Sequence, residues 1–153
     1  MALQPTPGAV LDYWIGPATH DHLAATRLHK RWFIKSAETD AFIQAQFGDL
    51  LDALGGGLAE RWAAAGARQS LAAIIVLDQF SRNIHRGKPN SFAYDALALS
   101  LAKRGIARGD LTALTEVEAS FYLMPLEHSE LLDDQEASIR QFEALALTSR
   151  AAI

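Results

Sequence analysis

Two short polar segments hold the residue types that could bind a ligand or carry out acid–base chemistry. The first, Asp78–Asn83 (DQFSRN), follows a strongly apolar run, and the second is Pro125–Glu130 (PLEHSE). Together they supply carboxylates, amides, a guanidinium and an imidazole, which are groups that hold anions or transfer protons in proteins. We therefore place the candidate functional site at these two segments.

The first segment has helical spacing, and it allows two interpretations. Asp78 and Arg82 are four residues apart, so their side chains can pair on one face of a helix. One interpretation is a buried ion pair that orients neighbouring helices, since an unpaired buried charge costs about 3–5 kcal/mol. The other is a polar pocket in which Arg82 and Asn83 hold the carboxylate or phosphate of a ligand.

The local balance of donors and acceptors favours a ligand. Asp78 alone cannot satisfy the five N–H groups of Arg82 and the donors that follow it, unless Glu127 or Glu130 also accepts hydrogen bonds. We therefore expect an external anion, with Arg82 as the main binding residue. The predicted ligand-binding residues are Asp78, Gln79, Arg82, Asn83, Arg86 and His128.

The second segment places an imidazole next to carboxylates. His128, Glu127 and Glu130 are therefore the candidate catalytic residues of a small hydrolase. A simpler interpretation is a hydrogen-bonded histidine between helices, with Glu130 favourably placed in the first turn of the next helix. We expect no bound metal, because the chain has no cysteine and no two histidines at helical ligand spacing.

Composition narrows the class of protein. A chain of 153 residues favours one domain, which we place at residues 1–153, and its 50% hydrophobic content supports a packed core. The net charge of −4 argues against a nucleic-acid partner. Without an apolar run of roughly 20 residues we expect no membrane partner. The lack of cysteine and of a leader segment predicts a cytoplasmic protein, and no motif indicates a cofactor.

Helix signals dominate the chain, and strand signals are weak. Thr6 followed by proline, and Ser36, are expected helix starts, and Thr115 with Glu118 has the spacing of a capping box. Leu71–Leu77 is apolar on every face, which predicts a central helix enclosed by others. We expect an all-α fold of seven or eight helices, packed as antiparallel hairpins.

Two features of the second half give further expectations. Pro125 should kink or end the helix that contains it. Residues 82–108 contain six basic residues and one acid, whereas residues 110–136 contain eight acids and no Lys or Arg. We predict that these two stretches pack together and neutralise each other, although a polarised surface that steers a charged ligand is the alternative.

Several motifs, taken in order, resemble a known family. They are Val10–Trp14 (VLDYW), Leu77–Asn83 (LDQFSRN) with Arg86-Gly87, Phe92-Ala93 with Asp95, and Pro125 with His128-Ser129-Glu130 and Gln135. The series is similar to a widespread bacterial family known as domain of unknown function nine-two-four. The resemblance covers about residues 10–142, and it implies an all-α, right-handed, tetratricopeptide-like stack of helical hairpins. It implies no established activity.

The resemblance also bears on the length of the domain and on its function. Other family members continue for a few dozen residues, so we expect this chain to lack that C-terminal part. We expect a protein that binds a small anionic molecule or a peptide, as tetratricopeptide-like surfaces often do. The alternatives are a small hydrolase that uses His128 with a neighbouring Glu, and a structural module that forms homo-oligomers.

Overall fold

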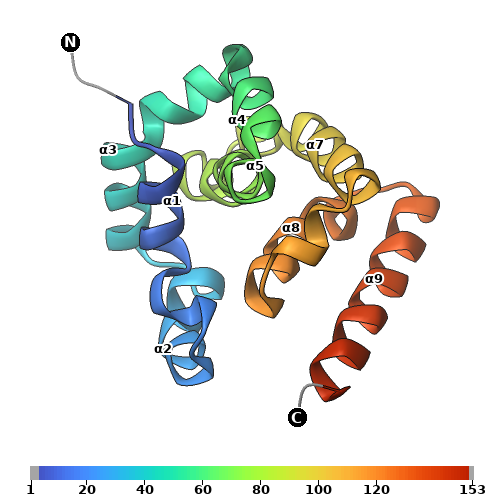
Figure 1. The fold of residues 1–153 in the computed structure, drawn as a ribbon. Coiled ribbons are helices and arrows are strands. Elements are labelled where there is room, and N and C mark those ends of the chain that lie inside the picture. The colour runs from blue at the N-terminus through green and yellow to red at the C-terminus, as the bar shows by residue number, and fades with distance from the viewer. Residues whose placement is uncertain (1–3, 152–153) are drawn as a thin grey trace.

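The computed structural model describes residues 4–151, and every regular element among them is helical. The helices are α1 (Pro7–Trp14), α2 (His22–Phe33), α3 (Ala37–Ala53), α4 (Ala59–Ala65), α5 (Ala67–Ile74), α6 (Ser81–Ile84), α7 (Asp95–Arg108), α8 (Glu116–His128) and α9 (Leu132–Ala151). Tighter or wider helical turns join them: η1 (Gly16–Thr19), η2 (Leu54–Leu58), η3 (Ile75–Phe80), η4 (Pro89–Phe92) and η5 (Asp110–Ala113). The predicted all-α fold class is confirmed (Figure 1). None of the described helices has the length and apolar character needed to cross a membrane.

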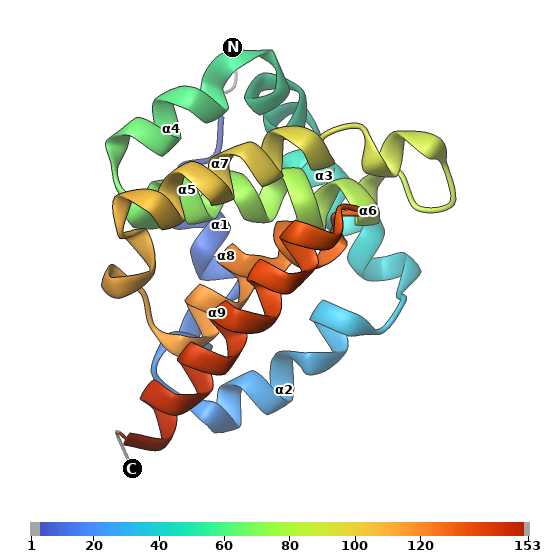
Figure 2. The ribbon, with the colours of Figure 1, turned by 90° about the vertical axis from the view of Figure 1, so that its right-hand side faces the viewer.

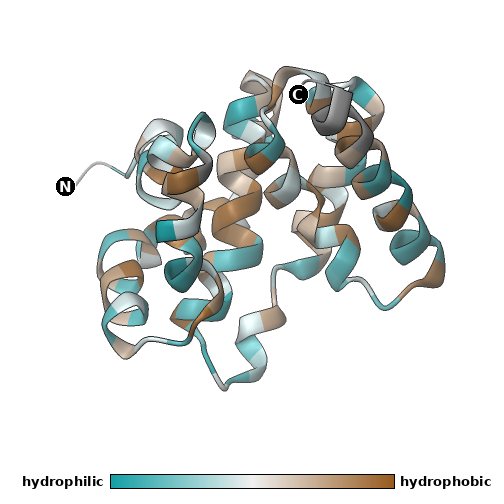
Figure 3. Cartoon of the chain, turned by 90° about the horizontal axis from the view of Figure 1, so that it is seen from below, coloured by the Kyte–Doolittle hydropathy of each residue, from teal (hydrophilic) through white to brown (hydrophobic). Residues whose placement is uncertain are grey.

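The core is built around α5 and its continuation η3. Helices α1, α4, α7 and α8 all pack against α5, which lies in the middle of the fold (Figure 1). Every side chain of Leu71–Leu77 is fully buried, which confirms the enclosed central helix. Apolar residues are accordingly concentrated on this helix (Figure 3). Each large apolar side chain buried here contributes roughly 1.5–3 kcal/mol relative to an exposed one.

The helix starts follow the predicted capping residues. The side chains of Thr6, Ser36 and Thr115 each accept a hydrogen bond from a backbone N–H in the first turn of α1, α3 and α8. Glu118 returns a hydrogen bond to the backbone N–H of Thr115 at 2.9 Å, which completes the capping box. Each such cap contributes about 1 kcal/mol to helix stability.

Pro125 does not end its helix, which was one of the two outcomes expected from the sequence. Helix α8 continues through Pro125 and ends at His128. The proline removes one backbone hydrogen bond, but only the last turn of α8 follows it, and its ring is buried in the core. The continuation places His128 on a helix instead of in a loop.

The two oppositely charged stretches meet only in part. Helix α7 packs against α8, and Lys103 Nζ lies 2.7 Å from Asp134 Oδ1. Arg108 likewise pairs with Asp110. Arg104 pairs instead with Glu60, and the two other arginines of the basic stretch also find their carboxylates outside the acidic one. The predicted packing of the two stretches is thus confirmed for α7 against η5 and α8, but three of the six basic residues pair with acids outside residues 110–136.

Helix α9 lies at the edge of the molecule, across α8 (Figure 2). Among its residues 132–146, only Asp134 and Ser138 are buried, and both are polar. Its first turn is held by Asp134, which accepts a hydrogen bond from Ser129 Oγ at 2.6 Å and pairs with Lys103. Polar contacts thus attach the start of α9, while its apolar residues stay at the surface.

Candidate functional site

The first predicted segment lies where the central helix widens. Helix α5 continues into η3, whose turns are of the wider π type, and then into α6. Such turns are frequent at functional sites because they reorient the side chains of a helix. Asp78 of η3 has only 1% of its surface exposed, so a carboxylate lies at the edge of the apolar core.

Asp78 brings the two predicted segments together. Its Oδ1 lies 2.9 Å from Nδ1 of His128, at the end of α8, and its Oδ2 accepts a hydrogen bond from Gln79 Nε2 at 2.8 Å. The side chain of His128 is 28% exposed. No residue of the described part of the chain bonds its other ring nitrogen, Nε2. The imidazole is thus oriented by a buried carboxylate and keeps one nitrogen for another partner.

Arg82, one helical turn after Asp78, also contacts the Asp78–His128 pair through Asp78. Its Nη1 donates to the backbone carbonyl of Asp78 at 2.6 Å and lies 3.5 Å from Oδ1 of the same residue. Both Nη atoms also donate to the two carboxylate oxygens of Asp95, each at 3.0 Å. The guanidinium lies over the ring of Phe92. Bidentate arginine–carboxylate pairs of this kind are stronger than pairs joined by a single hydrogen bond.

Asn83 and Arg86 are directed away from this group. Both donate to Asp40 of α3, Asn83 at 2.9 Å and Arg86 at 2.6 and 3.0 Å. Burial alone would raise the pKa of Asp40, but the hydrogen bonds from Arg86 and Asn83 together hold that pKa below its usual value. These two predicted ligand-binding residues connect α6 and the turn after it to α3.

The expected surplus of donors is therefore absent, because Asp95 and Asp40 supply the missing acceptors. Neither was among the predicted site residues. Asp95 could have been found, since it is the one acid in residues 82–108, a stretch that contains six basic residues. Nothing in the sequence relates Asp40 to Arg86, which is 46 residues away.

Glu127 and Glu130 do not form the predicted pair with His128. Both carboxylates are exposed, and no hydrogen bond joins either to His128 within residues 4–146. Successive residues of a helix point in different directions, which separates Glu127 from the imidazole of His128. The carboxylate that contacts the histidine is Asp78, 50 residues earlier.

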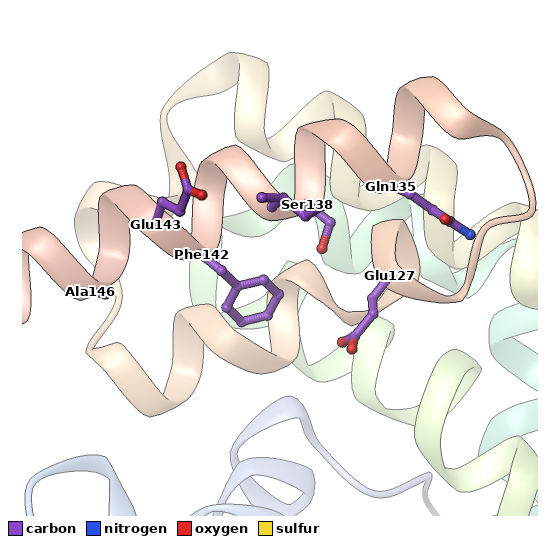
Figure 4. Close-up of a pocket in the computed structure, with 7 residues that line it drawn as sticks. Glu127, Gln135, Ser138, Phe142, Glu143 and Ala146 are labelled. Carbon is purple, nitrogen blue, oxygen red and sulfur yellow. The ribbon is translucent and has the colours of Figure 1, made fainter.

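Glu127 lies instead on a groove between α8 and α9. The groove has a volume of about 560 Å³, and Figure 4 shows Phe142 pointing from α9 toward α8, with Glu127 and Gln135 at one end. Its lining residues are Glu127, Gln135, Ser138, Ile139, Phe142, Glu143 and Ala146. No cluster of three or more potential metal-ligating side chains is found in the part of the chain that the structure describes.

A third polar cluster, not foreseen from the sequence, lies inside the fold. Tyr122 donates its hydroxyl hydrogen to Asp110 Oδ2 at 2.6 Å, and Ser70 Oγ lies 3.1 Å from the same hydroxyl. Arg108 donates two hydrogen bonds to Asp110. Because every member has a partner inside the fold, this cluster serves to connect α5, α7 and α8.

Comparison with known proteins identifies the family. A search among curated proteins gives no significant match. A solved structure from Agrobacterium tumefaciens, described as the protein of unknown function ATU0120, is similar with a TM-score of 0.79 and 29% sequence identity. The match covers 91% of this chain and 73% of that one. The sequence profile described as "bacterial protein of unknown function (DUF924)" matches residues 10–152. As its ordered motifs had indicated, the chain belongs to the DUF924 family.

Proposed function

We propose that this protein binds a small anionic molecule at the polar cluster, the name used below for Asp78, Arg82, Asp95 and His128. The contact between Asp78 Oδ1 and His128 Nδ1, at 2.9 Å, carries the proposal. An imidazolium held against a carboxylate by one N–H presents the other N–H, at Nε2, to a ligand. His128 is also the member of the buried pair that reaches the surface.

The charges of the polar cluster determine when an anion can bind. Arg82 contributes one positive charge, whereas Asp78 and Asp95 contribute two negative charges. With a neutral His128 the cluster is negative overall and repels anions. With a protonated His128 the charges balance, and the cationic N–H lies on the exposed side. Anion binding should therefore be stronger when His128 carries a proton than when it is neutral.

Acid–base catalysis is the second candidate, and the same contact favours it. If Asp78 accepts the Nδ1 proton of a neutral imidazole, Nε2 carries the lone pair and can remove a proton from water or a substrate. Asp78 would then orient His128, in place of the neighbouring glutamates suggested by the sequence. This function requires the neutral imidazole, so it has the opposite pH dependence to anion binding.

The pH dependence separates the two candidates. Sulfate stays a dianion over the pH range of interest, so its stabilising effect on Tm can be measured at pH 5.5 and pH 8, against chloride at equal ionic strength. Anion binding predicts a larger increase in Tm at pH 5.5, which His128→Gln abolishes and His85→Gln retains. Equal increases at both pH values, or an increase unaffected by His128→Gln, contradict the proposal.

The catalytic candidate is tested by hydrolysis of p-nitrophenyl acetate. It predicts a rate above that of buffer that rises with pH and is lost in both His128→Gln and Asp78→Asn. A rate that both variants retain excludes a role for this pair in the reaction.

We further propose that the helical hairpins follow a tetratricopeptide-like, right-handed order. The pairing of sequential helices supports this, with α4 against α5, α7 against α8, and α8 against α9. The acidic net charge and the lack of cysteine support a cytoplasmic protein without a nucleic-acid partner. The exposed side chains of Leu131, Leu132 and Ile139 are the observation that favours a structural or oligomerising module.

A further inference from the structure

A trough runs along the joint between α8 and α9. The groove beside Glu127 and a second hollow of about 260 Å³ both lie on these two helices and share Phe142 and Ala146. The second hollow is also lined by Glu116, Val117, Ser120 and Leu145. From Gln135 to Ala146 the trough follows α9 for about three helical turns, or about 16 Å. This length matches one side of a short helix.

The floor of the trough is apolar and uncovered. Ile139 is 58% exposed, and Phe142 and Leu145 are only half-buried, although all three belong to α9 and line the trough. Apolar side chains repeated at three- and four-residue spacing form a stripe that normally packs against another element. Covering them would contribute roughly 25 cal/mol per Å² of apolar surface removed from water. The trough therefore has the character of a docking surface.

The rim of the trough is acidic, and its negative charge favours a positively charged partner. Glu127 of α8 and Glu143 of α9 both line the trough, and neither forms a salt bridge with a described side chain. Among the described side chains that line the trough, there is no Lys or Arg. A second copy of this chain that docked trough to trough would bring the same carboxylates together and be repelled, as would an anionic polymer. A partner that carries basic residues beside an apolar stripe is attracted both by the carboxylates and by the apolar floor.

We propose that the trough between α8 and α9 binds a positively charged amphipathic helix of another protein. Its apolar face lies on Ile139, Phe142 and Leu145, and its Lys or Arg side chains reach Glu127 and Glu143. A helix laid into a groove between two helices is a common mode of peptide recognition. This proposal is independent of anion binding, because the polar cluster contributes no residue to the trough.

The test uses three fluorescein-labelled synthetic peptides and the complete chain. One is an amphipathic helix of Leu and Lys, the second replaces Lys by Glu, and the third has the Leu–Lys composition in scrambled order. Fluorescence anisotropy should show binding of the first peptide alone. Glu127→Gln with Glu143→Gln should weaken it about three- to tenfold. Ile139→Ser should weaken it about tenfold, because an apolar anchor is lost.

The control removes the same number of negative charges, both from α9. Asp133→Asn with Glu136→Gln removes two exposed carboxylates that do not line the trough, so the affinity should change by less than about twofold. Equal binding of the Lys and Glu peptides, an equal effect of both double variants, or no binding of the Leu–Lys helix overturns the proposal. A dimer in sedimentation equilibrium that Ile139→Ser converts to monomer overturns it as well, because the occupant would then be a second copy.

Discussion

Gly105 of α7 lies directly against the hydroxyl group of Tyr122 of α8. A Cβ atom at residue 105 would overlap that oxygen and would lie 2.7 Å from Asp110 Oδ2. The absence of a side chain at Gly105 therefore makes room for the hydrogen bonds that Tyr122 forms with Asp110 and Ser70.

Gly105→Ala should consequently destabilise the fold. Overpacking of this kind costs about 1–3 kcal/mol, and here the displaced tyrosine also loses buried hydrogen bonds. Urea denaturation measures the loss. Gly48→Ala in α3 is the control, since a Cβ there meets only Gln44 Cγ at 3.9 Å. A residue with a side chain favours the helix by up to about 1 kcal/mol over glycine, so this variant should gain stability. Equal effects of the two substitutions would contradict the packing argument.

Tyr122 should make the protein sensitive to alkali. Burial, reinforced by the hydrogen bond to Asp110, raises the pKa of Tyr122. A raised folded-state pKa gives stability that is complete below the unfolded value, about 10, and is lost as the pH rises above it. Wild-type Tm should fall between pH 9 and 11 more steeply than that of Tyr122→Phe. Parallel curves for the two proteins would show that the hydroxyl does not titrate with unfolding.

Asp40 should contribute to acid unfolding. Its hydrogen bonds with Arg86 and Asn83 outweigh burial and lower its pKa. A lowered folded-state pKa gives stability that is present above the unfolded value, about 3.9, and is lost as the pH falls through the folded one. The stability difference between wild type and Asp40→Asn should therefore be largest near pH 7 and shrink below pH 4. Asp52→Asn, an exposed change on the same helix, serves as the control.

The ion pair of Arg82 with Asp95 should be stronger than a surface pair. Its side chains are 25% and 29% exposed, whereas those of Arg104 and Glu60 are 50% and 53% exposed, with similar two-point geometry. Double-mutant cycles should give a coupling of about 1–2 kcal/mol for the first pair and below about 1 kcal/mol for the second. The reverse order would mean that solvent screens Arg82 more than its burial indicates.

Asp134 should control local opening of α9. Its bonds with Lys103 and Ser129 hold the first turn of the helix, while no apolar residue of 132–146 is buried. Asp134→Asn should therefore speed amide hydrogen exchange throughout α9 and leave exchange in α5 unchanged. The neighbouring exposed change Asp133→Asn should have no such effect. Uniformly faster exchange in α5 and α9 would show that α9 opens only with the whole domain.

The helical architecture could be predicted because its signals are local. The caps at Ser36 and Thr115 depend on residues three positions away, and the enclosed run Leu71–Leu77 is apolar on all faces. The end of α8 was not predictable in the same way. Pro125 is a strong local breaker, and its place inside a helix depends on its burial by other parts of the chain.

The two polar segments could be singled out from their residue types, but the pairing of their side chains could not be predicted. The carboxylate of Asp78 and the imidazole of His128 drew attention to the two polar segments. The structure places these two side chains in contact. The partners of Arg82 and Arg86 were missed because Asp95 and Asp40 lie 13 and 46 residues away. Ion pairs across such distances depend on how helices stack, which local sequence does not specify.

The position of α5 also has a consequence for synthesis on the ribosome. The helices that pack on it come from both sides in the chain, with α1 before it and α7 and α8 after it. Tyr122 reaches Ser70 only when α8 has emerged. Until then Leu71–Leu77 has no complete cover, and it is the kind of apolar run that chaperones shield in nascent chains. Translation that stops before residue 116 would release a fragment with this run exposed, and that fragment would aggregate.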